Sequence, residues 1–106
     1  MARFIHPDLA DVPLAAALHA LADPSRLNIV RRLDEDRRDG GAGLSCSDAA
    51  CPELPRATMS NHYNILRAAG LVEARKDGVR VLHRLRRQAV DARFPELLNA
   101  VLAASA

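Results

Sequence analysis

Apolar residues recur at helical spacing near the start of this 106-residue chain. A spacing of three or four residues places side chains on one face of a helix, and it is seen at Leu14, Ala17, Leu18 and Leu21. The predicted helix covers residues 13–22 and is almost without charge. A helix this apolar is buried on more than one side, so in a small domain we expect it to contact a second subunit.

A second helix is predicted to follow directly. Asp23 suits its N-cap, and Pro24 suits its first position, where a missing N–H costs nothing. Its apolar positions are Leu27, Ile29, Val30 and Leu33. The charged and glycine-rich run 34–43 is expected to end this helix as a mobile surface loop.

Two sets of polar residues are expected to be solvated. Residues 1–12 have little periodicity and are interpreted as an N-terminal arm in which His6 faces solvent. On the second helix, Arg26, Arg31 and Arg32 are interpreted as a solvated, salt-bridged face. Contact with phosphate is the alternative role for these three arginines.

The stretch 54–70 carries the most informative pattern. Its apolar stripe consists of Met59, His62, Tyr63 and Leu66, and Gly70 stands where a left-handed C-cap is required. The opposite face carries Thr58, Ser60, Asn61 and Asn64. Short polar side chains suit hydrogen bonds to base edges and phosphates, although an ordinary surface helix is the alternative. A short helix broken at Pro52 is predicted within 44–54, so the order over 44–70 is that of a helix-turn-helix.

The period changes from helix to strand after Gly70. Leu71 to Lys76 and Val79 to Leu85 are predicted strands, joined by a tight Asp77-Gly78 turn. The resulting hairpin over 71–85 is basic and follows the polar-faced helix, which is the position of a wing. One face is expected to carry Val79, Val81, His83 and Leu85, with His83 a packing residue and not a ligand. Arg80 and Arg84 lie on the other face.

The C-terminal region 88–104 returns to helical spacing, with Pro95 either starting a fresh helix or kinking one. Its apolar positions are Phe94, Leu97, Leu98, Val101 and Leu102. We expect this region and the helix over 13–22 to form a homodimer interface.

Charge is distributed unevenly along the chain. The formal net charge is +2, yet residues 56–87 hold eight Arg and Lys against two acids, whereas residues 1–55 hold six Arg against nine acids. Such a basic segment is the pattern of a phosphate-binding face on double-stranded DNA. Within this segment, the residues predicted to contact the DNA phosphate backbone are Arg56, Arg67, Lys76 and Arg80. Three aromatic residues are too few to build stacking platforms for single-stranded nucleic acid.

No run of eighteen apolar residues occurs, and the N-terminal sequence lacks the order of a signal peptide. We therefore expect a single cytoplasmic domain over residues 1–106, without a membrane partner and without a cofactor.

Two segments resemble the ArsR/SmtB-type winged-helix repressors. The start of the family's domain is similar to residues 20–33, ALADPSRLNIVRRL. The family's recognition helix and wing are similar to residues 57–85, ATMSNHYNILRAAGLVEARKDGVRVLHRL. The resemblance implies a mainly α winged helix-turn-helix fold with a β-hairpin, and a homodimer formed by the first and last helices. It implies repression through an inverted-repeat operator that is released by a metal, metalloid or oxidant. It also assigns base and phosphate contacts to Thr58, Ser60 and Asn61.

The family's sensing residues are incomplete in this chain. Where one family site has a Cys-x-Cys pair, Leu44 replaces the first cysteine and Cys46 matches the second, and the C-terminal region has no histidine for the other site. No metal site is therefore predicted. For Cys46 and Cys51 three roles remain open, namely inert packing, a thiol redox switch and binding of a soft metal or metalloid. The inducer is unknown.

Two other classes of function compete with DNA binding. A winged helix can act as a protein-interaction module, in which case the basic hairpin is merely a solvated wing. An enzyme would need a nucleophile such as Cys46 beside a histidine, but the sequence has no nucleophile elbow, phosphate loop or paired carboxylates. The sequence thus favours a non-enzymatic DNA-binding regulator.

Overall fold

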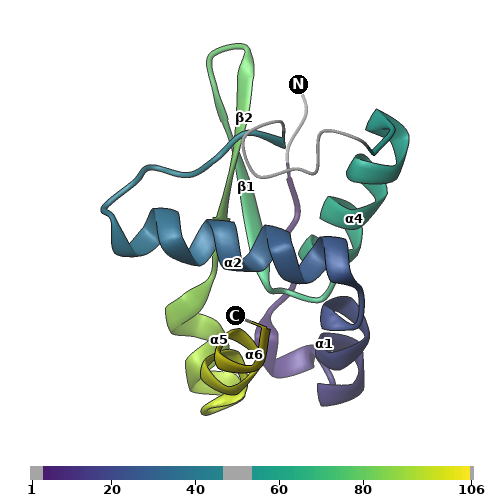
Figure 1. Cartoon of the computed structure of the whole chain (residues 1–106), viewed down its shortest axis with the longest axis vertical. Helices are drawn as coiled ribbons and strands as arrows, with labels where there is room; N and C mark the ends of the chain where they lie inside the picture. Colours follow the sequence, from purple (N-terminus) through teal and green to yellow (C-terminus); the bar gives the residue numbers. More distant parts are fainter. Residues whose placement is uncertain (1–3, 47–53, 106) are drawn as a thin grey trace.

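The computed structural model describes residues 4–46 and 54–105 and has the architecture of a winged helix-turn-helix (Figure 1). Helix α2 (Pro24–Arg38) crosses the middle of the molecule. Helix α4 (Arg56–Ala68) and the hairpin of β1 (Val72–Asp77) and β2 (Arg80–Leu85) extend from one side of α2. Helices α1 (Leu14–Leu21), α5 (Arg87–Arg93) and α6 (Leu97–Ser105) lie on the other side. None of the described helices is long and apolar enough to cross a membrane.

The predicted start of α2 is confirmed, but its predicted end is wrong. Asp23 caps the helix by accepting a hydrogen bond from the Arg26 N–H at 3.0 Å, and Pro24 occupies the first turn. The helix continues through Arg38 into the charged run that we expected to be a loop. The helix continues because Asp34 is buried and forms an ion pair with the Arg37 guanidinium one turn later, at 3.0 Å.

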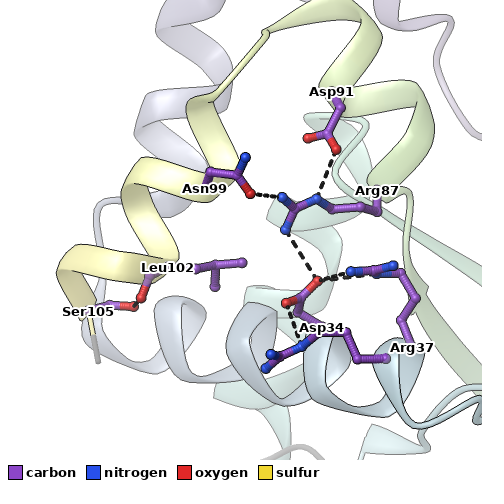
Figure 2. Close-up of polar contacts among 8 residues, drawn as sticks. Asp34, Arg37, Arg87, Asp91, Asn99, Leu102 and Ser105 are labelled. Atoms are coloured by element: carbon purple, nitrogen blue, oxygen red, sulfur yellow. Dashed lines mark hydrogen bonds and ion pairs between the residues drawn. The ribbon is translucent and has the colours of Figure 1, made fainter.

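Asp34 also joins α2 to the C-terminal helices (Figure 2). Its Oδ1 accepts from Nη1 of Arg87 at 3.3 Å, while Nε of Arg87 donates to Asp91 at 2.9 Å. Arg87 donates as well to Asn99 on α6. A turn at Pro95 separates α5 from α6, so of the two alternatives at this proline the structure has a fresh helix and not a kink.

The hairpin has the predicted basic character, but its turn lies one residue later than predicted. Asp77 pairs with Arg80, so the two loop residues are Gly78 and Val79. Gly78 adopts φ +63°, which suits the first position of a glycine-led two-residue turn. Val79 therefore lies fully exposed at the tip instead of on the strand face.

Two sequence predictions, the short helix within 44–54 and the role of Cys51, cannot be compared fully with the structure, and a third, for His6, is wrong. Most of 44–54 and the whole of Cys51 lie outside the described residues. Leu44 itself pairs with His83 of β2 in an isolated antiparallel bridge. The arm residue His6 is not solvated as expected, because its Nε2 accepts a hydrogen bond from the Ala74 N–H at 2.9 Å.

Arg26 is the clearest departure from the predicted solvated face. It is only 7% exposed and lies where α1, α2 and α4 meet. Its guanidinium donates to the carbonyl oxygens of Ala20 at 2.6 Å and His19 at 3.2 Å, at the end of α1. Because arginine only donates, Nδ1 of His62 on α4 is the acceptor of its third bond, at 3.1 Å. One buried cation thus connects three helices.

The carboxylate of Asp23 lies beside this junction. Desolvation raises the pKa of Asp23, but the hydrogen bond from the Arg26 N–H and the interactions with His62 and Arg26 outweigh it, so the net pKa is lowered. Nε2 of His62 lies 3.9 Å from Asp23 Oδ2. The ionised carboxylate therefore faces the cationic side of the junction.

Replacing Arg26 by methionine keeps the apolar stem but removes the three hydrogen bonds. We expect Arg26→Met to lower the free energy of unfolding by about 3 kcal/mol, because hydrogen bonds to a charged group are strong and their buried partners lose them. Urea unfolding followed by circular dichroism measures this. Arg84→Met is the matched control, since Arg84 is exposed, and equal stability losses in the two variants would contradict the role assigned to Arg26.

Candidate nucleic-acid interface

Helix α4 separates its side chains into a buried and an exposed face, as predicted. The buried residues are Met59, His62, Tyr63 and Leu66. The exposed side chains include all four polar residues singled out from the sequence, namely Thr58, Ser60, Asn61 and Asn64. Gly70 ends the segment with φ +77°, as expected of a left-handed C-cap. The outer face of α4 is therefore short-chained and polar.

The N-terminal end of α4 is suited to an anion. Its N-cap is Pro55, which makes no side-chain cap hydrogen bond. First-turn amides and the helix dipole favour negative charge at this position. The exposed Arg56 adds a full positive charge in the same turn.

The hairpin supplies two further cations of the predicted set. Lys76 and Arg80 are both exposed near the tip, and Arg80 lies opposite Asp77 in the last strand pair. The hairpin and α4 extend to the same side of α2 (Figure 1), and α4 packs on β1. The structure thus places Lys76 and Arg80 on the hairpin and the other six predicted contact residues on the adjacent helix.

Arg67 differs from the other predicted anchors because it is half-buried and already has partners. Its Nη2 donates to Oδ1 of Asn64 at 2.5 Å, so these two predicted contact residues are joined. Its guanidinium also lies over the ring of Phe4, 4.9 Å from the centroid. The orientation of Arg67 is therefore restricted by both α4 and the N-terminal arm.

His83 behaves as the packing residue predicted from its position. It is buried against Tyr63, with ring centroids 4.2 Å apart. Burial lowers the pKa of His83 to about 4; the neighbouring Leu44 backbone opposes this shift and Arg67 adds to it. His83 is therefore neutral near pH 7 and contributes no charge to the basic face.

The predicted thiol sensor is described only in part. Cys46 is a free, exposed cysteine whose carbonyl lies 3.5 Å from the Tyr63 hydroxyl. Although the residue as a whole is exposed, partial desolvation of its thiol raises the pKa of Cys46, and the charges of Arg67 and Arg56 offset this only partly. A raised pKa disfavours the reactive thiolate. Among the described residues no group of three or more His, Cys, Asp or Glu is placed to hold a metal ion.

Two residues beside the interface were missed by the sequence analysis. Arg26 precedes Ile29, Val30 and Leu33 by three, four and seven residues, so its place on the buried stripe was readable from the spacing. Phe4 lies in a segment without periodicity, and nothing in the sequence indicated its contact with Arg67.

Comparison with known proteins agrees with this geometry. A family model described as a helix-turn-helix domain matches residues 21–75. An uncharacterized HTH-type transcriptional regulator from Methanocaldococcus jannaschii is 36% identical over 89 residues, covering 82% of this chain and 89% of the relative. The crystal structure of the transcriptional repressor BigR from Xylella fastidiosa matches with a TM-score of 0.63 and 27% identity, over 86% of this chain and 84% of that one. The chain belongs to the helix-turn-helix family of DNA-binding transcriptional regulators.

Proposed function

We propose that this protein is a repressor of the ArsR type that binds an inverted-repeat operator as a homodimer. The observation that carries the proposal is the exposed polar face of α4 beside a basic hairpin, both on the same side of α2. The two segments that resemble ArsR-type repressors, and the similarity to a solved transcriptional repressor, support the finer assignment.

In the proposed mechanism α4 enters the major groove. Thr58, Ser60 and Asn61 contact bases or phosphates through short side chains, and an asparagine amide can form two hydrogen bonds with adenine. The first-turn amides and Arg56 hold a phosphate at the N-terminal end of α4. Lys76 and Arg80 of the hairpin contact the backbone beyond the groove.

Asn64 and Arg67 act as a pair in this mechanism. The hydrogen bond between them occupies Oδ1 of Asn64, which leaves the Asn64 amide N–H groups as donors. Arg67, which is restricted in orientation, contacts the DNA phosphate backbone beside Asn64.

The homodimer is supported by uncovered apolar surface. Leu14 and Leu18 on α1 are 49% and 46% exposed, although they belong to a nearly uncharged helix. Val101 and Leu102 on α6 are only partly buried. Both helices lie on the side of α2 opposite the hairpin (Figure 1). A dimer joined there leaves two α4 helices free to enter successive major grooves, about 34–36 Å apart.

DNA binding is tested by titrating random duplex at several salt concentrations. We expect steep salt dependence in the wild type, and Lys76→Ala or Arg80→Ala should weaken binding to all sequences alike and lower the salt slope by about one. Asn61→Ala should instead lose selectivity for sequences enriched from a random library. Arg38→Ala is the control, because Arg38 is exposed at the far end of α2.

Absence of salt-dependent binding in the wild type would contradict DNA recognition. It would favour a winged-helix protein-interaction module.

Dimerisation is tested by introducing charge on α1. Leu18→Glu should convert the dimer to monomer in analytical ultracentrifugation at micromolar concentration, because a carboxylate buried in an apolar interface is strongly unfavourable. Glu35→Gln, at an exposed position of α2, is the control. A wild-type monomer would eliminate the proposed interface.

A thiol-reactive inducer is the proposed signal, although burial raises the pKa of Cys46 and so opposes formation of its thiolate. Serine substitution tests this part of the proposal. Peroxide or arsenite should release wild-type protein from DNA, whereas Cys46→Ser and Cys51→Ser should remain bound, because a hydroxyl forms neither a disulfide nor a thiolate. Fluorescence anisotropy of labelled duplex follows the release. Equal release of wild type and both variants would remove the two cysteines from the mechanism.

A further inference from the structure

The N-terminal arm, defined here as residues 4–12, forms hydrogen bonds and packing contacts with the rest of the domain along most of the arm's length. His6 accepts a hydrogen bond from the Ala74 N–H of β1 at 2.9 Å. Arg86 donates to the carbonyl oxygens of Pro7 at 3.0 Å and Gly70 at 3.3 Å, so it bridges the arm and the end of the α4 segment. The arm therefore contacts both parts of the candidate interface.

Its second half is anchored to α5 and to the core. Arg93 donates to the carbonyl oxygens of Leu9 and Val12, both at 3.0 Å. The side chains of Leu9 and Val12 are buried. Leu9 packs so closely on Gly70 that a Cβ there would stand 2.7 Å from its Cδ2. These contacts hold the second half of the arm in place. The first half lies between the hairpin and α4 (Figure 1).

At the start of the arm, the Arg67 guanidinium lies over the Phe4 ring, with Cζ 4.9 Å from the ring centroid. A cation over an aromatic ring is attracted by the negative face of the ring. Arg67 also donates to Asn64. With Cζ held over the Phe4 ring and Nη2 bound to Asn64, the guanidinium is restricted in orientation.

His6 performs the corresponding task for the hairpin. Ala74 lies on β1, which pairs with β2 on one side only within the described residues. The His6 ring satisfies a backbone N–H on the other side and ties the edge of β1 to the arm. Because Nε2 is the acceptor, this bond requires its lone pair to be free of a proton.

We propose that the arm is a positioning element of the DNA interface, in which Phe4 orients Arg67 and His6 holds the hairpin at a fixed angle to α4. Pre-organised contacts cost less entropy on binding than side chains that must be ordered by the ligand. This inference rests on the proposed DNA binding and assigns functional weight to residues outside the helix-turn-helix.

The test is a double-mutant cycle on DNA affinity. Phe4→Ala should weaken binding about two- to fivefold, which is the range expected from loss of one cation–π contact. In the Arg67→Met background, Phe4→Ala should have no further effect, because the group that it orients is gone. Ile5→Ala is the matched control, since Ile5 is the neighbouring arm residue and its side chain is 86% exposed. Urea unfolding midpoints measured in parallel should be the same as that of the wild type, because surface substitutions rarely change stability.

His6 is tested by rescue. His6→Ala should weaken DNA binding and speed hydrogen exchange of the Ala74 amide, whereas His6→Gln should preserve both, because its side-chain carbonyl can accept the same bond. Unchanged affinity in Phe4→Ala and His6→Ala, or equal losses from Phe4→Ala with and without Arg67, would overturn the positioning role. A wild type that binds DNA without salt dependence would overturn the proposed function itself, and with it this inference.

Discussion

The buried guanidinium of Arg26 is the interaction on which the arrangement of the helices depends. It satisfies two carbonyl groups at the C-terminal end of α1 and Nδ1 of His62 in the middle of α4, while its own backbone N–H is bound by Asp23. A burial of this kind is favourable only when all donors find acceptors in one geometry. A single charged side chain therefore joins the helix with uncovered apolar residues to the helix with the polar outer face, in addition to their shared apolar core.

A second buried charge performs a similar task at the other end of α2. Asp34 binds Arg37 on its own helix and Arg87 on α5, and Arg87 continues to Asn99 on α6 (Figure 2). Helix α2 thus has an apolar middle and a charged junction at each end. Each junction leads from the core to one of the helices that carry uncovered apolar surface.

The apolar spacing predicted most of this fold because helix faces follow directly from sequence periodicity. The stripes of α2 and α4, the cap at Asp23, the glycine at the end of α4 and the break at Pro95 all follow from local chemistry. On α1 only Ala17 and Leu21 of the predicted stripe are buried, while Leu14 and Leu18 are exposed. The two errors on α2 share one cause. Arg26 and Asp34 continue the stripe of α2 at both ends, but their charge suggested solvent, because burial of a charge depends on partners supplied by distant parts of the chain.

The same limit explains why the candidate interface was found while its support was not. Exposed polar residues on α4 and exposed cations on the hairpin follow from alternation of buried and exposed positions within one element. The contacts of Phe4 with Arg67 and of His6 with Ala74 join residues more than sixty positions apart. No local pattern encodes such pairs, and a short aperiodic segment looks the same whether it is solvated or packed. The part of a DNA-binding surface that determines orientation is therefore less visible in sequence than the part that determines contact.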